Sequence, residues 1–155
     1  MNENFSPQVA RLAAKEEKTH DWACRFLDSP GGNQNMAKGM RRRFESGEVY
    51  WLGPINFPLH ELTRCCGPEK GIEYPETEKI WIGKLGKLRR AIKEGEKFPV
   101  IIVNPRPWPI LSIRDGNHRY EALCLEKKKK YWTLFWFDNK KDEQKFKRKY
   151  RDLVK

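Results

Sequence analysis

Two short apolar runs on either side of a proline-rich segment constrain the fold of this chain most strongly. Residues 98–103 (FPVIIV) and 110–113 (ILSI) are rich in β-branched side chains, and residues 104–109 (NPRPWP) separate them. β-Branched side chains favour strands, whereas closely spaced prolines lack the backbone N–H groups that a helix needs. The pattern therefore predicts two short strands joined by a proline-rich turn.

The second apolar run leads into a polar pentapeptide at the start of a predicted helix. Residues 115–119 (DGNHR) follow the run after Arg114, and we predict a helix from Asn117 to about residue 128. Gly116 permits a tight bend, and Asn117 is suited to cap the helix. A strand end, a bend and a helix start are therefore expected within a few residues of one another.

This join is a candidate site for an anion. The first turn of a helix has backbone N–H groups without partners inside the helix, and these groups and the helix dipole favour phosphate. Arg119 can bind two phosphate oxygens at once, and His118 can donate a further hydrogen bond. Asp115 could order the loop, orient Arg119 or bind a Mg²⁺ ion that bridges phosphates. An ordinary surface turn is the alternative, because Asp-Gly is a common turn sequence.

The remaining pattern predicts an α/β (α+β mixed) fold. Further elements are expected as a helix at 7–27 that ends before the breaker run 29–33, strand structure within 48–62, a loop at 63–77, a helix at 78–94, a strand at 131–137 and a last helix capped by Asp138. Pro54 and Pro58 indicate that the strand at 48–62 is broken or lies at a sheet edge. We predict a helical arm at 1–47, then a domain at 48–155 with a short mixed sheet and a basic C-terminal helix.

Positive charge is concentrated near the C-terminus. The chain has a formal net charge of +11, and residues 127–155 hold twelve Lys or Arg and four Asp or Glu, a net +8. Such a segment attracts polyanions such as DNA, although a solvated helix face is the simpler interpretation. The candidates for nucleic-acid contacts are Lys145, Lys147, Arg148, Lys149 and Arg151. The aromatic strand at 131–137 could stack bases, but its alternation is more typical of a core.

The four cysteines match neither a disulfide scaffold nor a paired zinc motif. Cys65 and Cys66 with nearby His60 could bind a metal, but no second ligand pair follows at zinc-finger spacing, so reduced thiols are expected. No apolar stretch approaches about 18 residues, and charged residues interrupt the first twenty, which argues against a membrane span and a signal peptide. We expect a soluble, cytoplasmic protein.

The segment "PVIIV…PILSIRDGNHRYEAL" resembles the core of the ParB/sulfiredoxin superfamily. The resemblance covers about residues 49–137, because "INFPLHEL", "LRRAIKEGEKFPVIIV" and "DGNHRYEA" occur in the order that these domains use. It implies a small ParB/sulfiredoxin-like fold whose helix start, at Gly116, Asn117, His118 and Arg119, binds the phosphates of ATP, ADP or CTP. It also implies a Mg²⁺ ion at Asp115.

Departures from the superfamily patterns narrow the expected chemistry. Sulfiredoxins place a reactive Cys immediately before His-Arg, whereas this chain has Asn117 there, so sulfinic-acid repair is not expected. ParB proteins have a G-E-R-R type of sequence and a following helix-turn-helix domain, for which the last residues here leave no room. The sequence is more similar to the D-G-H-H-R form of free-serine kinases, which use a glutamate as general base. Glu61, Glu69 and Glu73 are candidates for that base, and Glu69 is favoured.

Three functions remain open from the sequence. The leading hypothesis is a nucleotide-binding enzyme for phosphoryl transfer or NTP hydrolysis, with Asp115, His118 and Glu69 as catalytic residues. The second is a DNA-binding ParB-like protein or nuclease that uses the basic C-terminal helix. The third is a partner-binding protein whose nucleotide site is vestigial.

Overall fold

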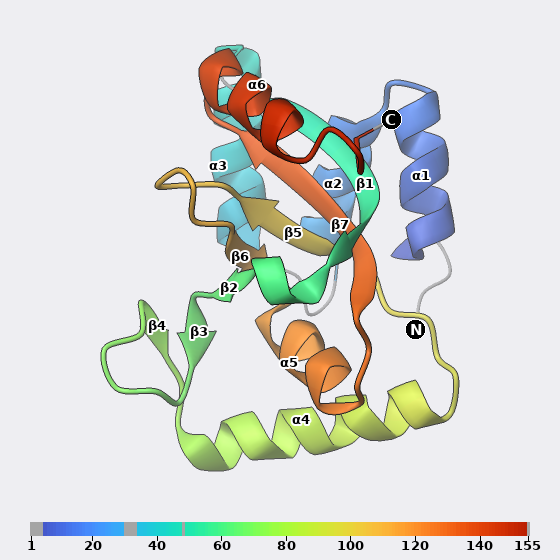
Figure 1. Ribbon diagram of the computed structural model, residues 1–155, viewed down its shortest axis with the longest axis vertical. Helices are drawn as coiled ribbons and strands as arrows, with labels where there is room; N and C mark the ends of the chain where they lie inside the picture. Colours follow the sequence, from blue (N-terminus) through green and yellow to red (C-terminus); the bar gives the residue numbers. More distant parts are fainter. Residues whose placement is uncertain (1–4, 30–33, 48, 155) are drawn as a thin grey trace.

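A five-stranded mixed sheet forms the centre of the fold (Figure 1). The computed structural model describes residues 5–29, 34–47 and 49–154, and its main sheet has the strand order β1-β7-β5-β6-β2. Two of its three inner strands, β5 (Ile101–Asn104) and β7 (Lys130–Phe137), run parallel to each other. The predicted α/β class with a short mixed sheet is therefore confirmed.

The other three strands complete the sheet on both sides. β1 (Tyr50–Pro58) pairs antiparallel with β7 at one edge of the sheet, the position that its prolines predicted. A register shift between Leu52 and Ile55 accommodates Pro54. On the other side, β6 (Ser112–Asp115) is antiparallel to β5, and β2 (Thr63–Arg64) is parallel to β6. The predicted loop at 63–77 also contains a small ribbon of β3 (Cys66–Gly67) and β4 (Tyr74–Pro75).

Three N-terminal helices cover one face of the sheet. These are α1 (Pro7–Lys15), α2 (Thr19–Asp28) and α3 (Gln34–Glu45). Trp22, Leu27 and Met40 on the helices share a buried cluster with Ile102 and Leu134 on the central strands. Residues of the predicted arm therefore share a hydrophobic core with the sheet.

The prediction of one helix from residue 7 to 27 is wrong. The chain leaves the helical path at Glu17, whose φ of 59° is left-handed, and the Lys18 N–H bonds back to the Ala13 carbonyl at 2.8 Å. This closes α1 and lets α2 start in a new direction. Residues 30–33 of the predicted break lie outside the described residues, and α3, which carries the Arg41–Arg43 cluster, was not predicted.

The opposite face of the sheet packs against the C-terminal helix α6 (Lys140–Lys149). Phe135 and Phe137 of β7 point to this side and contact the ring of Phe146, with ring centroids 4.6 and 5.4 Å away. Successive residues of β7 thus point to opposite faces of the sheet and contribute to the hydrophobic clusters on both faces. Asn139, rather than the predicted Asp138, caps α6 because its side chain accepts a hydrogen bond from the Asp142 N–H.

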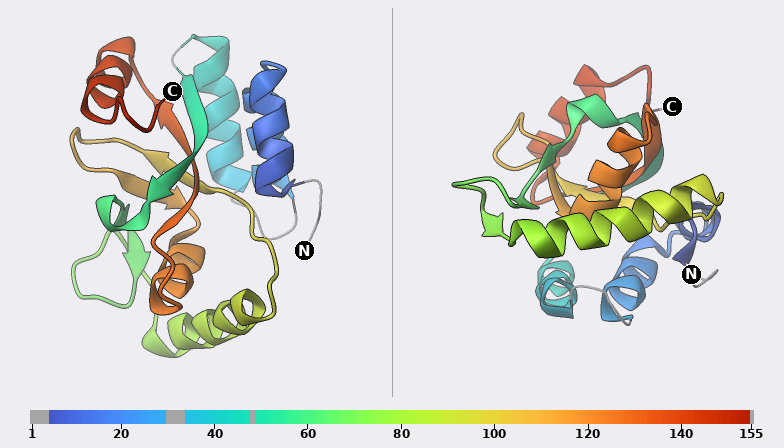
Figure 2. Two further views of the ribbon diagram at one scale, coloured as in Figure 1. Left: turned by 45° about the vertical axis from the view of Figure 1, so that its right-hand side comes forward. Right: turned by 90° about the horizontal axis from the view of Figure 1, so that it is seen from below.

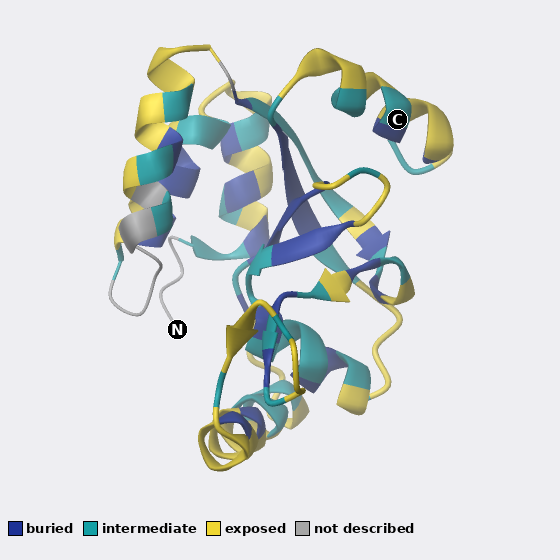
Figure 3. Ribbon diagram, turned by 90° about the vertical axis from the view of Figure 1, so that its left-hand side faces the viewer, coloured by how far each residue is buried: buried dark blue, intermediate teal, exposed yellow. Residues whose placement is uncertain are grey.

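Helices α4 (Glu78–Lys93) and α5 (Asn117–Leu125) form a third group below the sheet, where Figure 2 shows α4 crossing under α5. Trp81 and Leu85 of α4 pack against Ala122 of α5, so the predicted amphipathic helix at 78–94 is confirmed. Figure 3 shows burial concentrated in the sheet and in the helix faces turned toward it. Within the described residues, none of the helices has the length and hydrophobicity needed to cross a bilayer.

Candidate functional site

The join between β6 and α5 has the geometry that the sequence predicts, except at the helix cap. β6 ends at Asp115, and Gly116 follows in the left-handed region with φ of 101°. Gly116 rather than Asn117 is the N-cap, because the bend needs a positive φ that glycine tolerates best. No side chain of the described residues caps the first turn of α5. Its backbone N–H groups are therefore without a side-chain acceptor.

Asn117 is turned into the protein. Its Oδ1 accepts hydrogen bonds from the N–H groups of Cys65 at 2.9 Å and Cys66 at 3.3 Å, and its Nδ2 donates to the Ile113 carbonyl at 3.3 Å. The residue is 7% exposed. The side chain thus anchors the loop after β2 to the start of α5, and its backbone is the part left for a ligand.

Arg119 is also bound within the protein. Its Nη2 donates to the Val100 carbonyl at 2.9 Å and to Asp115 Oδ2 at 2.8 Å, and its side chain is 17% exposed. The same contact occupies one carboxylate oxygen of Asp115, the predicted Mg²⁺ ligand. Arg119 Nε is buried without a partner in the described part of the chain. The predicted phosphate arginine and metal ligand therefore bind each other.

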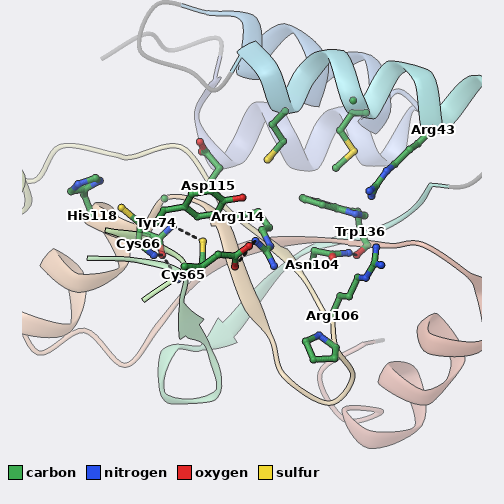
Figure 4. A pocket seen from close by; sticks show the side chains of 17 residues that line it. Arg43, Cys65, Cys66, Tyr74, Asn104, Arg106, Arg114, Asp115, His118 and Trp136 are labelled. Carbon is green, nitrogen blue, oxygen red and sulfur yellow. Dashed lines mark hydrogen bonds and ion pairs between the residues drawn. The ribbon is translucent and has the colours of Figure 1, made fainter. Parts of the chain in front are cut away.

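A cleft of about 1020 Å³ opens beside this join (Figure 4). Three arginines line it: Arg43 on α3, Arg106 in the proline-rich turn and Arg114 on β6. Arg43 and Arg106 lie 2.7 and 3.6 Å from the Asp138 carboxylate, and Arg114 lies 3.0 Å from that of Glu73. Asp115 also lines the cleft and pairs with Arg119, so three carboxylates stand against four guanidinium groups, which leaves one positive charge in excess at the cleft.

Trp136 adds an unpaired donor to the same cleft. The residue is 4% exposed, and its Nε1 has no hydrogen-bond partner within the described residues. Figure 4 shows its indole between Arg43 of the α3 wall and Asn104 of β5, whose side chain bonds to the Trp136 carbonyl at 3.0 Å. An unsatisfied buried N–H is costly, but the atom is itself buried, so a ligand in the cleft would reach it only after the indole moved.

A second cleft of about 740 Å³ lies on the α4 side of the same join. Its basic side chains include Lys84, Lys87 and Arg90. Gly116 and His118 line both clefts. The start of α5 is therefore bordered by basic side chains on two sides.

His118 belongs to a hydrogen-bonded group that the sequence did not predict. Its Nε2 lies 2.9 Å from Glu76 Oε1, and its ring centroid is 4.7 Å from that of Trp81. Lys84 donates to the other Glu76 oxygen at 3.2 Å. Burial acts to raise the pKa of Glu76, but the hydrogen bonds from His118 and Lys84 outweigh it and hold this pKa below its usual value. Burial raises the pKa of the neighbouring Cys66 thiol.

Glu69, the glutamate favoured as general base, lies away from both clefts. Glu69 is half exposed, lines neither cleft and is bonded to Arg64 at 3.2 Å. That hydrogen bond lowers the pKa of Glu69, which makes its carboxylate a weaker base. Glu61 also lines neither cleft, whereas Glu73 lines the first one and Glu76 contacts His118.

The basic residues of the C-terminal helix lie apart from this site. Neither cleft is lined by any of the predicted nucleic-acid contacts, Lys145, Lys147, Arg148, Lys149 and Arg151. Lys147 pairs with Glu143 at 3.6 Å, and Arg148, Lys149 and Arg151 are exposed. They form a separate basic surface on and after α6.

Comparisons of the chain with models of protein families, with curated proteins and with solved structures find no match. The resemblance to the ParB/sulfiredoxin superfamily therefore remains a prediction from the residues at 49–137.

Proposed function

We propose that the protein binds a nucleotide, with its phosphates at the first turn of α5. The observation that carries this proposal is an uncapped helix start that opens onto a cleft lined by three arginines. Backbone N–H groups at a helix start and guanidinium groups both bind phosphate oxygens well. The resemblance of residues 49–137 to the ParB/sulfiredoxin superfamily points to the same use of this turn.

The cleft also suits the rest of a nucleotide. Its volume of about 1020 Å³ is at the upper end of the range usual for small-molecule sites. Away from the helix start, Met40 and Trp136 line the cleft, and both residues are largely buried. Arg43 and Arg106 lie at the same end of the cleft as Trp136, so positive charge is present at both ends (Figure 4).

The reaction that best fits such a site is phosphoryl transfer or NTP hydrolysis. This chemistry depends mainly on positioning and on neutralising phosphate charge, which the arginines and the helix start can supply. Among the glutamates that the sequence proposed as the base, Glu73 is the one that lines the cleft. Asp115 Oδ2 is bonded to Arg119, so Asp115 would bind Mg²⁺ through Oδ1 or by exchanging that bond.

Calorimetric titration with ATP, ADP and CTP, each with and without Mg²⁺, tests the proposal. Arg114→Ala should weaken binding by about 1.5–3 kcal/mol, the value of a hydrogen bond to a charged group. Arg114 is preferred to Arg119 because Arg119 bonds to Val100 and Asp115 and its loss would disturb the fold. Arg148→Ala is the matched control, since it removes the same charge outside both clefts. Binding of none of the three nucleotides, or equal effects of the two variants, would contradict the proposal.

DNA binding through α6 is the second candidate. Arg148 and Arg151 are exposed and form no ion pair within the described residues, so both charges are available to phosphates. Fluorescence anisotropy with duplex DNA should then show affinity that falls steeply as salt rises. Replacing both arginines by Ala should flatten that salt dependence, and an unchanged slope would remove α6 as the site.

A further inference from the structure

Cys66, Glu76 and His118 bring three different metal-binding groups together at the edge of the first cleft. The Cys66 Sγ, a Glu76 carboxylate oxygen and a His118 ring nitrogen all lie within 4.8 Å of one another, and all three residues are half-buried. They come from three separate elements: β3, the segment before α4 and the first turn of α5. Local sequence spacing therefore does not explain the grouping.

We infer that these three side chains form a binding site for a transition-metal ion, with zinc as the best match. Thiolate, imidazole and carboxylate ligands together suit Zn²⁺, whereas Mg²⁺ prefers oxygen ligands alone. Zinc bonds of about 2.0–2.3 Å place neighbouring ligand atoms roughly 3.5 Å apart. Small side-chain rotations would bring the present group to that spacing.

The surroundings hold all three ligands near this arrangement. Asn117 Oδ1 fixes the Cys66 backbone N–H at 3.3 Å and so ties β3 to α5. The Trp81 ring supports His118, and Lys84 holds the second carboxylate oxygen of Glu76 at 3.2 Å. Such supporting contacts orient metal ligands in known sites. When the ion binds, the Cys66 thiol proton leaves to solvent, the proton on His118 Nε2 moves by way of solvent to Nδ1, and the His118–Glu76 hydrogen bond gives way to two metal bonds.

The site differs from the predicted metal sites. Asp115, the predicted Mg²⁺ ligand, is bonded to Arg119 and does not belong to the group, and Cys66 is joined by His118 rather than by His60. Three protein ligands leave a fourth position open for water or a ligand oxygen. Cys66 and His118 both line the first cleft, so that position is accessible from it. Metal binding here does not require the proposed nucleotide.

Cobalt(II) substitution tests the inference without nucleotide. Metal-free protein carrying no histidine tag should bind one equivalent of Co²⁺ and show a thiolate-to-cobalt charge-transfer band. Cys66→Ser should lose the band, while Cys124→Ser, the control at another half-buried free thiol, should keep it. In competition with a chromophoric chelator, Cys66→Ser and Glu76→Gln should each weaken Zn²⁺ binding by at least about tenfold. Replacing a residue that only supports a metal ligand already weakens binding by about this much. Absence of the band in the unsubstituted protein, or its persistence in Cys66→Ser, overturns the site.

Alkylation of the unsubstituted protein provides a second readout that does not depend on variants folding. One equivalent of Zn²⁺ should slow iodoacetamide labelling of Cys66, measured by mass spectrometry, and leave the rate at Cys124 unchanged. Equal labelling rates of Cys66 with and without Zn²⁺ would overturn the inference.

Discussion

Replacing Asn117 by Ala tests whether one buried amide anchors the loop of Cys65 and Cys66 to the start of α5. The substitution removes the acceptor of two backbone N–H groups and the donor to the Ile113 carbonyl, at a residue that is 7% exposed. One unsatisfied buried polar group costs about 1–3 kcal/mol. Neighbouring losses do not add fully, so the free energy of unfolding should fall by roughly 2–4 kcal/mol.

Equilibrium urea unfolding, followed by tryptophan fluorescence and far-ultraviolet circular dichroism, measures this loss. Asn139→Ala is the matched control, because it removes the same side chain from the exposed cap of α6, where the cost should be about 1 kcal/mol. The Asn117 N–H remains in the variant, so the folded variant should still bind nucleotide. If Asn117→Ala destabilises the protein no more than Asn139→Ala, the anchoring role is refuted.

Two other substitutions test the join and the packing of α6. Gly116→Ala should destabilise the fold by roughly 1–3 kcal/mol in urea unfolding, because φ is 101° and the new Cβ would lie 2.8 Å from Arg119 Nη2; an unchanged midpoint would show that the bend can relax. Burial and the hydrogen bond to Glu61 raise the pKa of Tyr150 from 10.0 to about 12. The folded state therefore holds this proton more tightly than the unfolded state, and stability is lost as pH rises from about 10 through about 12. Between pH 9 and 11, the free energy of unfolding of Tyr150→Phe should fall less than that of the unsubstituted protein. Equal falls in the two proteins would exclude ionisation of Tyr150 as a cause of the stability loss.

Local sequence patterns predicted the helices and strands whose signals lie within one continuous segment. The stripe through Trp81 and Leu85 predicted α4, and the two β-branched runs predicted β5 and β6. The division between α1 and α2 escaped prediction because a glutamate, Glu17, takes the left-handed conformation that normally signals glycine. α3 was missed because Gly39 and three consecutive arginines weaken its pattern, and Met40 is buried only by tertiary contacts.

The candidate site was predictable in position but not in side-chain direction. Residues 115–119 do form a strand end, a bend and a helix start. Asn117 turns inward because its partner Cys65 lies 52 residues away in sequence, a contact that no local pattern reveals. Glu76 and Trp136 were missed for the same reason, whereas Arg114, directly before the DGNHR segment, could have been proposed from its position.

Backbone amide chemical shifts measured while ATP or ADP is added test most directly whether the start of α5 binds phosphate. The proposed site predicts that the N–H signals of Asn117, His118 and Arg119 shift most and that they saturate together with the binding curve. Signals that move mainly in α6, or no movement at residues 117–119 at saturating nucleotide, would contradict it.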